Sequence, residues 1–216
     1  VLEGLFALGH ARSFRAAQFD SVLRHGCDEG HIATEWVDRS GVPLRLGSAR
    51  QRRGGWEYRV EGAREVRAAE IAARAPTLCF EPGSHLIVSG PSERRRRLMD
   101  WGVFHVERMP SALWSEWQRI LRQRNEALRI RDLQQLDAFD ALLGTAGERL
   151  DRARSRLAER WLGRSAQVLS WLSEEVGGVT LEYRRGWGRA HATLVEALHA
   201  ARERDMTQGF TSVGPH

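Results

Sequence analysis

Seven apolar residues in the middle of the chain are spaced alternately three and four positions apart, and this spacing limits the fold more than any other feature. They are Leu136, Phe139, Leu143, Ala146, Leu150, Ala153 and Leu157. A 3-4 repeat places all of its members on one face of an α-helix and is typical of a heptad seam. The repeat slips at Trp161, so any supercoil should be short. The pattern predicts one long helix over 133–176.

Signals for strands and for further helices flank this segment. Pro91-Ser92-Glu93 and Pro110-Ser111 are helix starts, because proline is tolerated where the first N–H groups have no helical partner. Gly9 predicts the left-handed end of a helix over 1–8. Additional helices are predicted over 65–75 and 190–204, and strands over 31–37, 42–46, 56–60, 77–80, 179–183 and 209–213. The order predicts an α/β fold with two lobes, 1–90 and 91–216, the second mainly helical and returning to strand at its end.

Every basic residue of the chain is an arginine. The 33 basic residues exceed the 28 acidic ones by five, and none of them is lysine. A Schiff base, a catalytic lysine or a P-loop lysine within this chain is therefore excluded. The basic excess predicts a polyanionic partner only weakly, and a GC-rich coding bias explains the preference for arginine equally well.

Other functional classes leave no trace in the sequence. Cys27 and Cys79 form no paired motif and are expected to be reduced thiols in a cytoplasmic protein. No metal-ligand spacing, nucleophile elbow or membrane-spanning apolar run is present. The residues alone therefore predict no catalytic residue, no metal site, no membrane contact and no named enzyme.

Arginines gather in three groups along the helical part of the chain, and these groups could contact phosphate. On a helix beginning at Pro91, four consecutive arginines spread around the axis, so some of Arg94, Arg95, Arg96 and Arg97 should pair with Glu93 or Asp100 while others stay available. A second group follows, with Arg122 and Arg124 among its members, and a third occupies 149–164. The candidate DNA-binding residues are Arg94, Arg95, Arg96, Arg122 and Arg124. The alternative is a solvated, salt-bridged helix surface.

The loop 9–15 is a fourth basic site. Arg12 and Arg15 follow a helix C-terminus, and the small residues Gly9, Ala11 and Ser13 would let the backbone approach a ligand closely. Favourable placement of cations at the negative end of a helix dipole is the alternative explanation.

Four segments of the chain, in order from end to end, match motifs of one known family. The first joins Val1-Leu2-Glu3 to the stretch 8–15, and the second runs from Phe80-Glu81-Pro82-Gly83-Ser84-His85 through 92–107. The third is Gln123-Arg124-Asn125-Glu126-Ala127-Leu128. The last combines Ala201-Arg202-Glu203-Arg204-Asp205, Gly209-Phe210-Thr211-Ser212 and Gly214-Pro215-His216. Together these segments resemble the RecF family of bacterial DNA replication and repair proteins. The order Glu81-Pro82 reverses the Pro-Glu of many relatives.

The resemblance implies an ABC-type ATPase related to SMC heads. By that resemblance the chain is an internal piece: 1–90 is part of the ATP-binding lobe after the Walker A motif, and 91–216 is an inserted helical lobe. The signature and Walker B motifs, and the main ligands of ATP and Mg²⁺, would lie outside it, so the chain is expected to be inactive alone. Arg15, with Arg12 beside it, falls where SMC-like proteins place an arginine that reaches the nucleotide.

The resemblance also implies a cellular role. The family forms an ATP-dependent homodimer that clamps double-stranded DNA near single-strand gaps during DNA damage repair and the SOS response, and it helps to load recombinase with RecO and RecR. Two other hypotheses stay open. One is a non-enzymatic, arginine-rich helical nucleic-acid binder, and the other is a coiled-coil interaction module built on the seam from Leu136 to Leu157.

Overall fold

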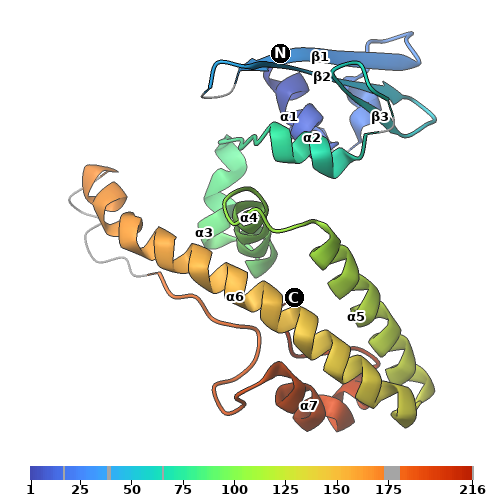
Figure 1. The fold of residues 1–216 in the computed structure, drawn as a ribbon, viewed down its shortest axis with the longest axis vertical. Helices are drawn as coiled ribbons and strands as arrows, with labels where there is room; N and C mark the ends of the chain where they lie inside the picture. The colour runs from blue at the N-terminus through green and yellow to red at the C-terminus, as the bar shows by residue number, and fades with distance from the viewer. Residues whose placement is uncertain (17, 38–39, 65, 173–180, 216) are drawn as a thin grey trace. The chain divides into compact units, whose positions relative to one another are not determined.

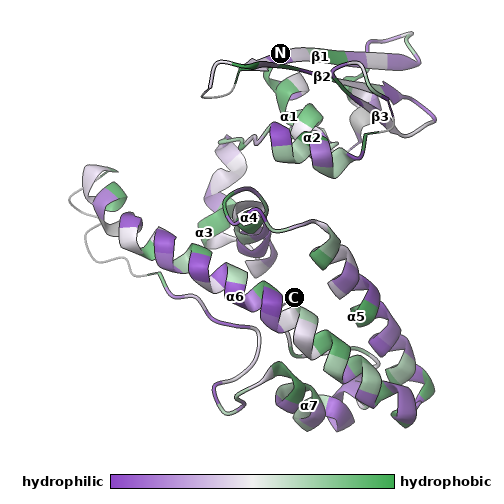
Figure 2. Cartoon of the chain, viewed as in Figure 1, coloured by the Kyte–Doolittle hydropathy of each residue, from purple (hydrophilic) through white to green (hydrophobic). Residues whose placement is uncertain are grey.

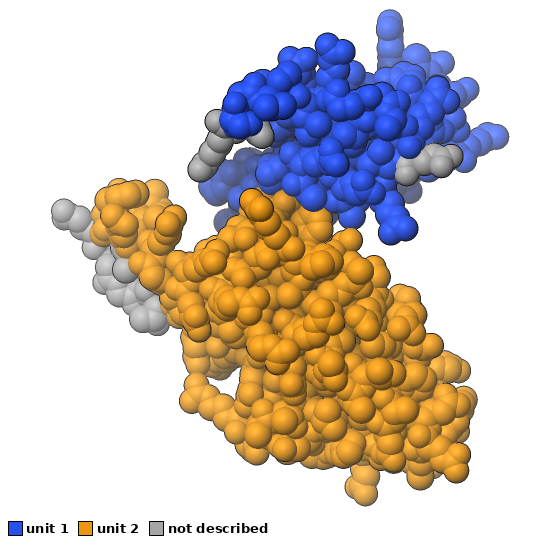
Figure 3. Space-filling model, in the orientation of Figure 1, with its two compact units in different colours: residues 1–86 blue, residues 87–216 orange. Residues whose placement is uncertain are grey.

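A computed structural model describes residues 1–216 except 17, 38–39, 65, 173–180 and 216. The chain divides into two compact units, Val1–Leu86 and Ile87–His216 (Figure 3). The sequence-based boundary between 90 and 91 lies four residues beyond this division. Each unit has its own hydrophobic core, and the two are described separately below.

Unit 1 is a three-stranded antiparallel sheet with two helices packed on one face (Figure 1). The strands are β1 (Glu29–Val37), β2 (Pro43–Gln51) and β3 (Trp56–Val60), in the order β1-β2-β3. The helices are α1 (Leu2–His10) and α2 (Ala68–Arg74), with short 3-10 turns η1 (Phe19–Val22) and η2 (Pro82–His85). The three strands and the two helices of this unit were predicted, although β1 and β2 are longer than the sequence indicated.

The core of unit 1 lies between the sheet and its helices. Leu46, Tyr58 and Val60 from the sheet pack against Leu8 of α1 and Ile71 of α2. Figure 2 shows hydrophobic segments on α1 and α2 where they face the sheet. This burial supplies the main favourable term for folding the unit.

Two details of unit 1 differ from the sequence-based expectations. Gly9 lies inside α1, and the left-handed residue that ends the helix is Ala11, with φ of 53°. A Cβ on Gly9 would stand 2.6 Å from Oγ1 of Thr77, so the glycine serves a close approach and not a helix end. The strand predicted over 77–80 is absent, and Leu78 and Phe80 are 65% and 96% exposed. The run 77–80 pairs with no strand of the sheet, so its backbone N–H and C=O groups form no strand hydrogen bonds.

The regular elements among the described residues of unit 2 are all helices. It contains α4 (Ser92–His105), α5 (Ala112–Ile130), α6 (Leu133–Leu172) and α7 (Leu194–Gln208), and the short α3 (Leu86–Ser89) begins at the boundary. The strand predicted over 209–213 is an irregular loop. Of the strand predicted over 179–183, positions 179–180 lie outside the described residues, and 181–183 form no strand.

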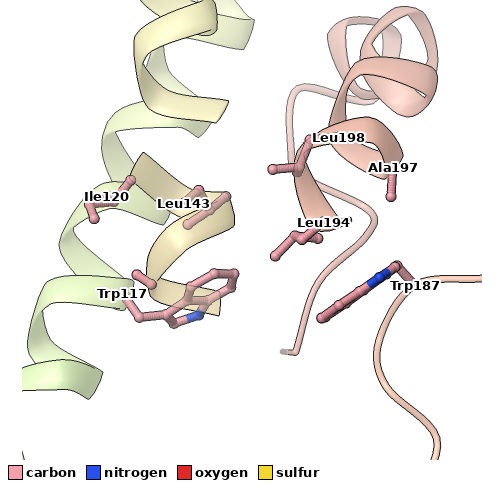
Figure 4. Close-up of a cluster of buried hydrophobic side chains, with 8 residues drawn as sticks. Trp117, Ile120, Leu143, Trp187, Leu194, Ala197 and Leu198 are labelled. Carbon is pink, nitrogen blue, oxygen red and sulfur yellow. The ribbon is translucent and has the colours of Figure 1, made fainter. Parts of the chain in front are cut away.

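The predicted heptad seam is the central face of α6 and is buried within the chain. Leu136, Leu143, Leu150, Ala153 and Leu157 are each at most 1% exposed. The first half of the seam packs with α5 and α7, and the second half packs with α4. Figure 4 shows Trp117 and Ile120 of α5, Leu143 of α6 and Leu194 of α7 converging with Trp187. Because the seam faces helices of its own chain, it argues against a coiled-coil scaffold formed between copies.

Glycines allow the close packing of α6. A Cβ on Gly147 would stand 2.4 Å from Leu194 and 2.6 Å from the ring of Trp117, and one on Gly144 would stand 2.3 Å from Val195. Real side chains do not approach so closely, so these glycines set the distance at which α5 and α7 pack on α6.

Candidate nucleotide and nucleic-acid contacts

The loop after α1 is held by hydrogen bonds to one serine. The Ser13 hydroxyl accepts the N–H groups of Arg15 and Ala16, each at 2.9 Å, and donates to the Glu3 carboxylate in the first turn of α1. Ser13 is buried, whereas the Arg15 side chain is exposed and forms no hydrogen bond or ion pair with any described residue. The turn thus fixes the backbone and leaves the Arg15 guanidinium available to an anion.

Arg12 is anchored by aromatic rings. Its guanidinium lies 5.8 Å from the ring centroid of Phe6, and that ring stacks on His10 at 4.1 Å. The His10 Nε2–H donates to the carbonyl oxygen of Thr77 at 2.9 Å. Burial, the largest cause, lowers the pKa of His10, so the ring is neutral at neutral pH and adds no charge beside Arg12.

These residues fit a peripheral contact to a phosphate group and not a complete nucleotide site. The loop offers two exposed guanidinium groups, and that of Arg12 lies over the Phe6 ring. Across the described positions, no three histidine, cysteine or acidic side chains are grouped so that they could hold a metal ion.

The four arginines at the start of α4 divide into engaged and available groups. Arg95 donates to the carbonyl oxygens of Ile87, Val88 and Gly90 at 3.0–3.2 Å and thereby satisfies backbone groups around α3. Arg96 and Arg97 both pair with Glu93, at 3.1 and 3.0 Å. The hydrogen bond from Arg97, followed by the effects of Arg96, lowers the pKa of Glu93. Arg94 is exposed and has no polar partner among the described residues.

The two candidate arginines of α5 have opposite environments. Arg122 is exposed, with no ion pair in the described part of the chain. Arg124 is fully buried at 0% exposure. The Arg124 guanidinium pairs with Asp140 at 2.5 Å and Asp205 at 2.8 Å. Because it has no surface that DNA could reach, Arg124 leaves the candidate DNA-binding set, and this corrects the sequence-based assignment.

The partners of Arg124 form a polar cluster that joins α5, α6, α7 and the loop after α7. Arg124 also donates to the Thr211 hydroxyl at 2.8 Å, and Asn125 accepts the Thr211 N–H at the same distance. Sequence reasoning missed this cluster, although a signal was present. Arg124 lies four residues after Ile120 and four before Leu128, which places it on the buried stripe of α5. A charge at such a position needs buried partners of opposite charge.

A second buried arginine holds the last described residues. Arg154 of α6 is 6% exposed, pairs with Asp100 of α4 at 2.6 Å and donates to the carbonyl oxygen of Pro215. Nearby, the Gly214 N–H donates to the Gly186 carbonyl oxygen at 2.9 Å. The segments 201–205 and 209–215, which carry part of the family resemblance, are therefore held against the helices of unit 2 by buried arginines.

An open hollow of about 910 Å³ lies beside the segment 182–189, next to α6. Its cations are already engaged. Arg184 and Arg189 pair with Glu182, and Arg185 donates to carbonyl oxygens at 191 and 192 while lying 5.0 Å from the centroid of the Trp187 ring. The hollow therefore presents no free positive charge comparable to that of Arg15, Arg94 or Arg122.

Curated relatives match this chain along its whole length. The DNA replication and repair protein RecF of Xanthomonas euvesicatoria pv. vesicatoria (strain 85-10) is 36% identical over 220 residues, and that of Stenotrophomonas maltophilia (strain R551-3) is 38% identical. RecF of Marinomonas sp. (strain MWYL1) is 34% identical over 217 residues. The matches cover all of this chain and 58–60% of these relatives, so the chain spans about three fifths of their length.

Solved structures agree with the sequence matches. The recombination mediator protein RecF bound to ATP, from the RecFOR pathway, superposes with a TM-score of 0.84 at 20% identity, over 100% of this chain and 61% of that one. A second RecF structure from the same pathway gives a TM-score of 0.82 at 22% identity. This likeness confirms the predicted fold class, a partial head lobe with an inserted helical lobe.

Two further results complete the comparison. No protein-family model matches the chain. No helix in the described ranges combines the length and the apolar character that a membrane crossing requires. Identity of 34–38% over the whole chain, together with the shared fold, decides the assignment: the chain belongs to the RecF family.

Proposed function

We propose that this chain contributes to a RecF-type, ATP-dependent DNA-binding clamp in the cytoplasm. The clamp would act in recombinational repair and replication restart, bind double-stranded DNA near single-strand gaps and aid recombinase loading with RecO and RecR. Support comes from relatives named for DNA replication and repair, and from matched structures of RecF bound to ATP in the RecFOR pathway. Unit 1 would be part of the ATP-binding lobe, and unit 2 would be the helical lobe.

The observation that carries the nucleotide part of the proposal is the Arg15 loop. Its backbone is fixed by the Ser13 turn, while its guanidinium is exposed and unpaired among the described residues. Because the backbone is already fixed, only the side chain remains to be ordered when Arg15 contacts an anion. We assign Arg15 a contact to the nucleotide, and Arg12 a supporting role beside it. ATP and Mg²⁺ would be held mainly by residues other than those described above.

The DNA part of the proposal rests on the exposed arginines of unit 2. Arg94 and Arg122 are available, whereas Arg95 and Arg96 keep part of their surface exposed after their internal contacts. These four remain the proposed DNA contacts, since guanidinium groups match phosphate oxygens in geometry. A non-enzymatic nucleic-acid binder would use the same residues but would show no response to ATP.

The test is Arg15→Ala in the complete protein. Since the side chain is exposed and holds no core contact, folding should be unchanged while ATP-dependent dimerisation weakens by roughly 10-fold or more, the effect of losing about 1.5–3 kcal/mol from a hydrogen bond to a charged group. Sedimentation velocity with and without ATP measures the shift. Arg53→Ala, another exposed arginine of unit 1, is the matched control. Dimerisation that Arg15→Ala leaves at the control level would remove Arg15 from the site, and a wild-type protein that ignores ATP would overturn the proposed function.

A further inference from the structure

Five arginines lie along one side of α6, and none of them belongs to the proposed nucleotide or DNA contacts. They are Arg149, Arg152, Arg156, Arg160 and Arg164, and we call them the arginine stripe. Their steps of three, four, four and four residues keep all of them within about 120° of arc on a helix of 3.6 residues per turn. At about 1.5 Å per residue, the stripe extends for roughly 22 Å along the helix. Figure 2 shows hydrophilic bands recurring along this part of α6.

The stripe lies on the surface, whereas the other arginine of the segment does not. All five members are exposed, and the side chains of Arg152, Arg156 and Arg160 are 61%, 54% and 61% accessible. Arg154, within the same run, is buried and pairs with Asp100. The arginines of this segment thus fall into two groups: Arg154 lies in the core, and the five members of the stripe lie on the solvent-exposed side of the helix.

Part of the stripe is held in place by a nearly buried carboxylate. Glu107, with 7% of its side chain exposed, pairs with Arg156 at 2.9 Å and with Arg160 at 3.3 Å. Its loop packs on α6 through Met109, a neighbour of Leu157. Glu148 approaches Arg152 only to 3.9 Å. With these two carboxylates and the exposed Glu159 counted against five guanidinium groups, the surface keeps a charge of about +2, and Arg149 and Arg164 have no ion pair among the described residues.

The surroundings of the stripe favour a phosphate backbone over a protein partner. Among the described residues between 149 and 164, the exposed large apolar side chain is Leu162, at 37%. It lies about 80° outside the arc of the arginines, so the stripe itself has no aromatic or aliphatic anchor of the kind on which protein interfaces centre. Interfaces with DNA are more polar and more positively charged. Over the roughly 22 Å of the stripe, one DNA strand presents about six phosphates at roughly 3.4 Å each, which is enough to meet five arginines.

We propose that the arginine stripe of α6 is a second binding surface for the phosphate backbone of duplex DNA, separate from Arg94 and Arg122. The inference rests on the proposed function, because it takes the same polymer as its ligand. It adds a surface that carries affinity without reading base sequence. Glu107 pre-orders Arg156 and Arg160, which lowers the conformational cost of closing them on phosphates.

The test compares two triple variants of the complete protein on a mixed-sequence duplex. Arg149→Gln, Arg152→Gln and Arg164→Gln together remove three members of the stripe but leave both pairs with Glu107 intact. Arg24→Gln, Arg53→Gln and Arg59→Gln remove the same charge from exposed positions of unit 1. If the three stripe residues each neutralise a phosphate, the slope of log K against log salt should become shallower by about 2.7 in the stripe variant and stay unchanged in the control.

Each outcome decides one question. A stripe variant that binds the duplex with the wild-type slope overturns the stripe, as does a control variant that loses as much as the stripe variant. Poly-glutamate is added as a competitor at a charge concentration equal to that of the duplex. If it displaces the duplex from the wild type but not from the stripe variant, the stripe is a site for acidic proteins, and the phosphate assignment is overturned. Wild-type protein without duplex affinity would instead overturn the proposed function itself. Equal melting temperatures of the two variants exclude unfolding as the cause.

Discussion

At the scale of the residue, the decisive feature is an arginine that serves the interior. Arg124 belongs to a resemblance segment and to a basic cluster, and both facts favoured a role in binding. Its position on the apolar stripe of α5 was the better guide, because the side chain is completely buried against Asp140 and Asp205. Residue type alone cannot separate a phosphate contact from an internal ion pair. The position of the residue relative to the buried face can.

Replacing this arginine should destabilise unit 2. Arg124→Met leaves Asp205 buried without a cation and leaves Asp140 with Arg202 and His199 as its ion-pair partners. Removing one member of a buried ion pair costs about 3–5 kcal/mol, and urea unfolding should show a loss of that order. Arg122→Met, two positions away and exposed, should change stability by no more than about 0.5 kcal/mol. Equal effects of the two variants would contradict the structural role of Arg124.

At the scale of the element, periodicity predicted helices well and strands less well. The heptad seam located α6 and its buried face, and the glycine-bounded runs located the three strands of unit 1. The runs 77–80 and 209–213 have strand-like composition but form no strand. A strand depends on a partner contributed by distant sequence, so a short apolar run does not determine it. A long helix satisfies its own backbone, and its pattern is therefore sufficient.

Two glycines of α6 allow the effect of helix propensity on stability to be measured apart from the effect of packing, because Gly163 has open space around it and Gly147 does not. Gly163 is exposed, and a Cβ added there would have no neighbouring atom within 4 Å. Gly163→Ala should therefore stabilise unit 2 by about 0.5–1 kcal/mol, because alanine has the higher helix propensity. Gly147→Ala gains the same propensity but places a methyl group 2.6 Å from the buried Trp117 ring, and overpacking of this kind costs about 1–3 kcal/mol. Thermal unfolding should thus shift in opposite directions. A stabilising Gly147→Ala would show that α5 and α7 can move away from α6 without loss.

At the scale of the whole molecule, the chain is two units with separate cores, and each contains one of its two tyrosines. Burial raises the pKa of Tyr58 in unit 1 to about 12. Burial, and then the hydrogen bond that the Tyr183 hydroxyl donates to Asp151, raise the pKa of Tyr183 in unit 2. Because both pKa values lie above the ordinary value of about 10, each phenol stabilises its unit fully below pH 10, and this stabilisation is lost as the pH rises through the folded pKa.

The two phenols can therefore report on the two units independently. In urea sufficient to unfold unit 2 of Arg124→Met, Tyr183 should ionise near pH 10 while Tyr58 still ionises near 12. Near-ultraviolet phenolate absorbance against pH measures both steps, and Tyr183→Phe in the same background identifies the first. A single step shared by both tyrosines would show that the units unfold together.

Sequence reasoning identified the family and the division into two units, because these depend on local patterns and ordered motifs. The roles that it gave to Arg12 and Arg15 stay predictions. It did not find the Arg124 cluster or the division of the α6 arginines between the core and the surface. Those features depend on which helix faces meet, and the partners of Arg124 lie 16, 81 and 87 positions away along the chain.

The same separations have a consequence for synthesis on the ribosome. Arg124 is made 87 residues before Thr211, the most distant of its side-chain partners. At about 5–20 residues per second, roughly 4–17 seconds pass before that partner has been added. The described core residues of unit 1, up to Ala75, have already been made by then, whereas α5 and α6 cannot yet bury Arg124 with all of its partners. A nascent chain that stalls before Asp205 would hold a folded sheet followed by an open helical segment, which is the kind of intermediate that chaperones and proteases recognise.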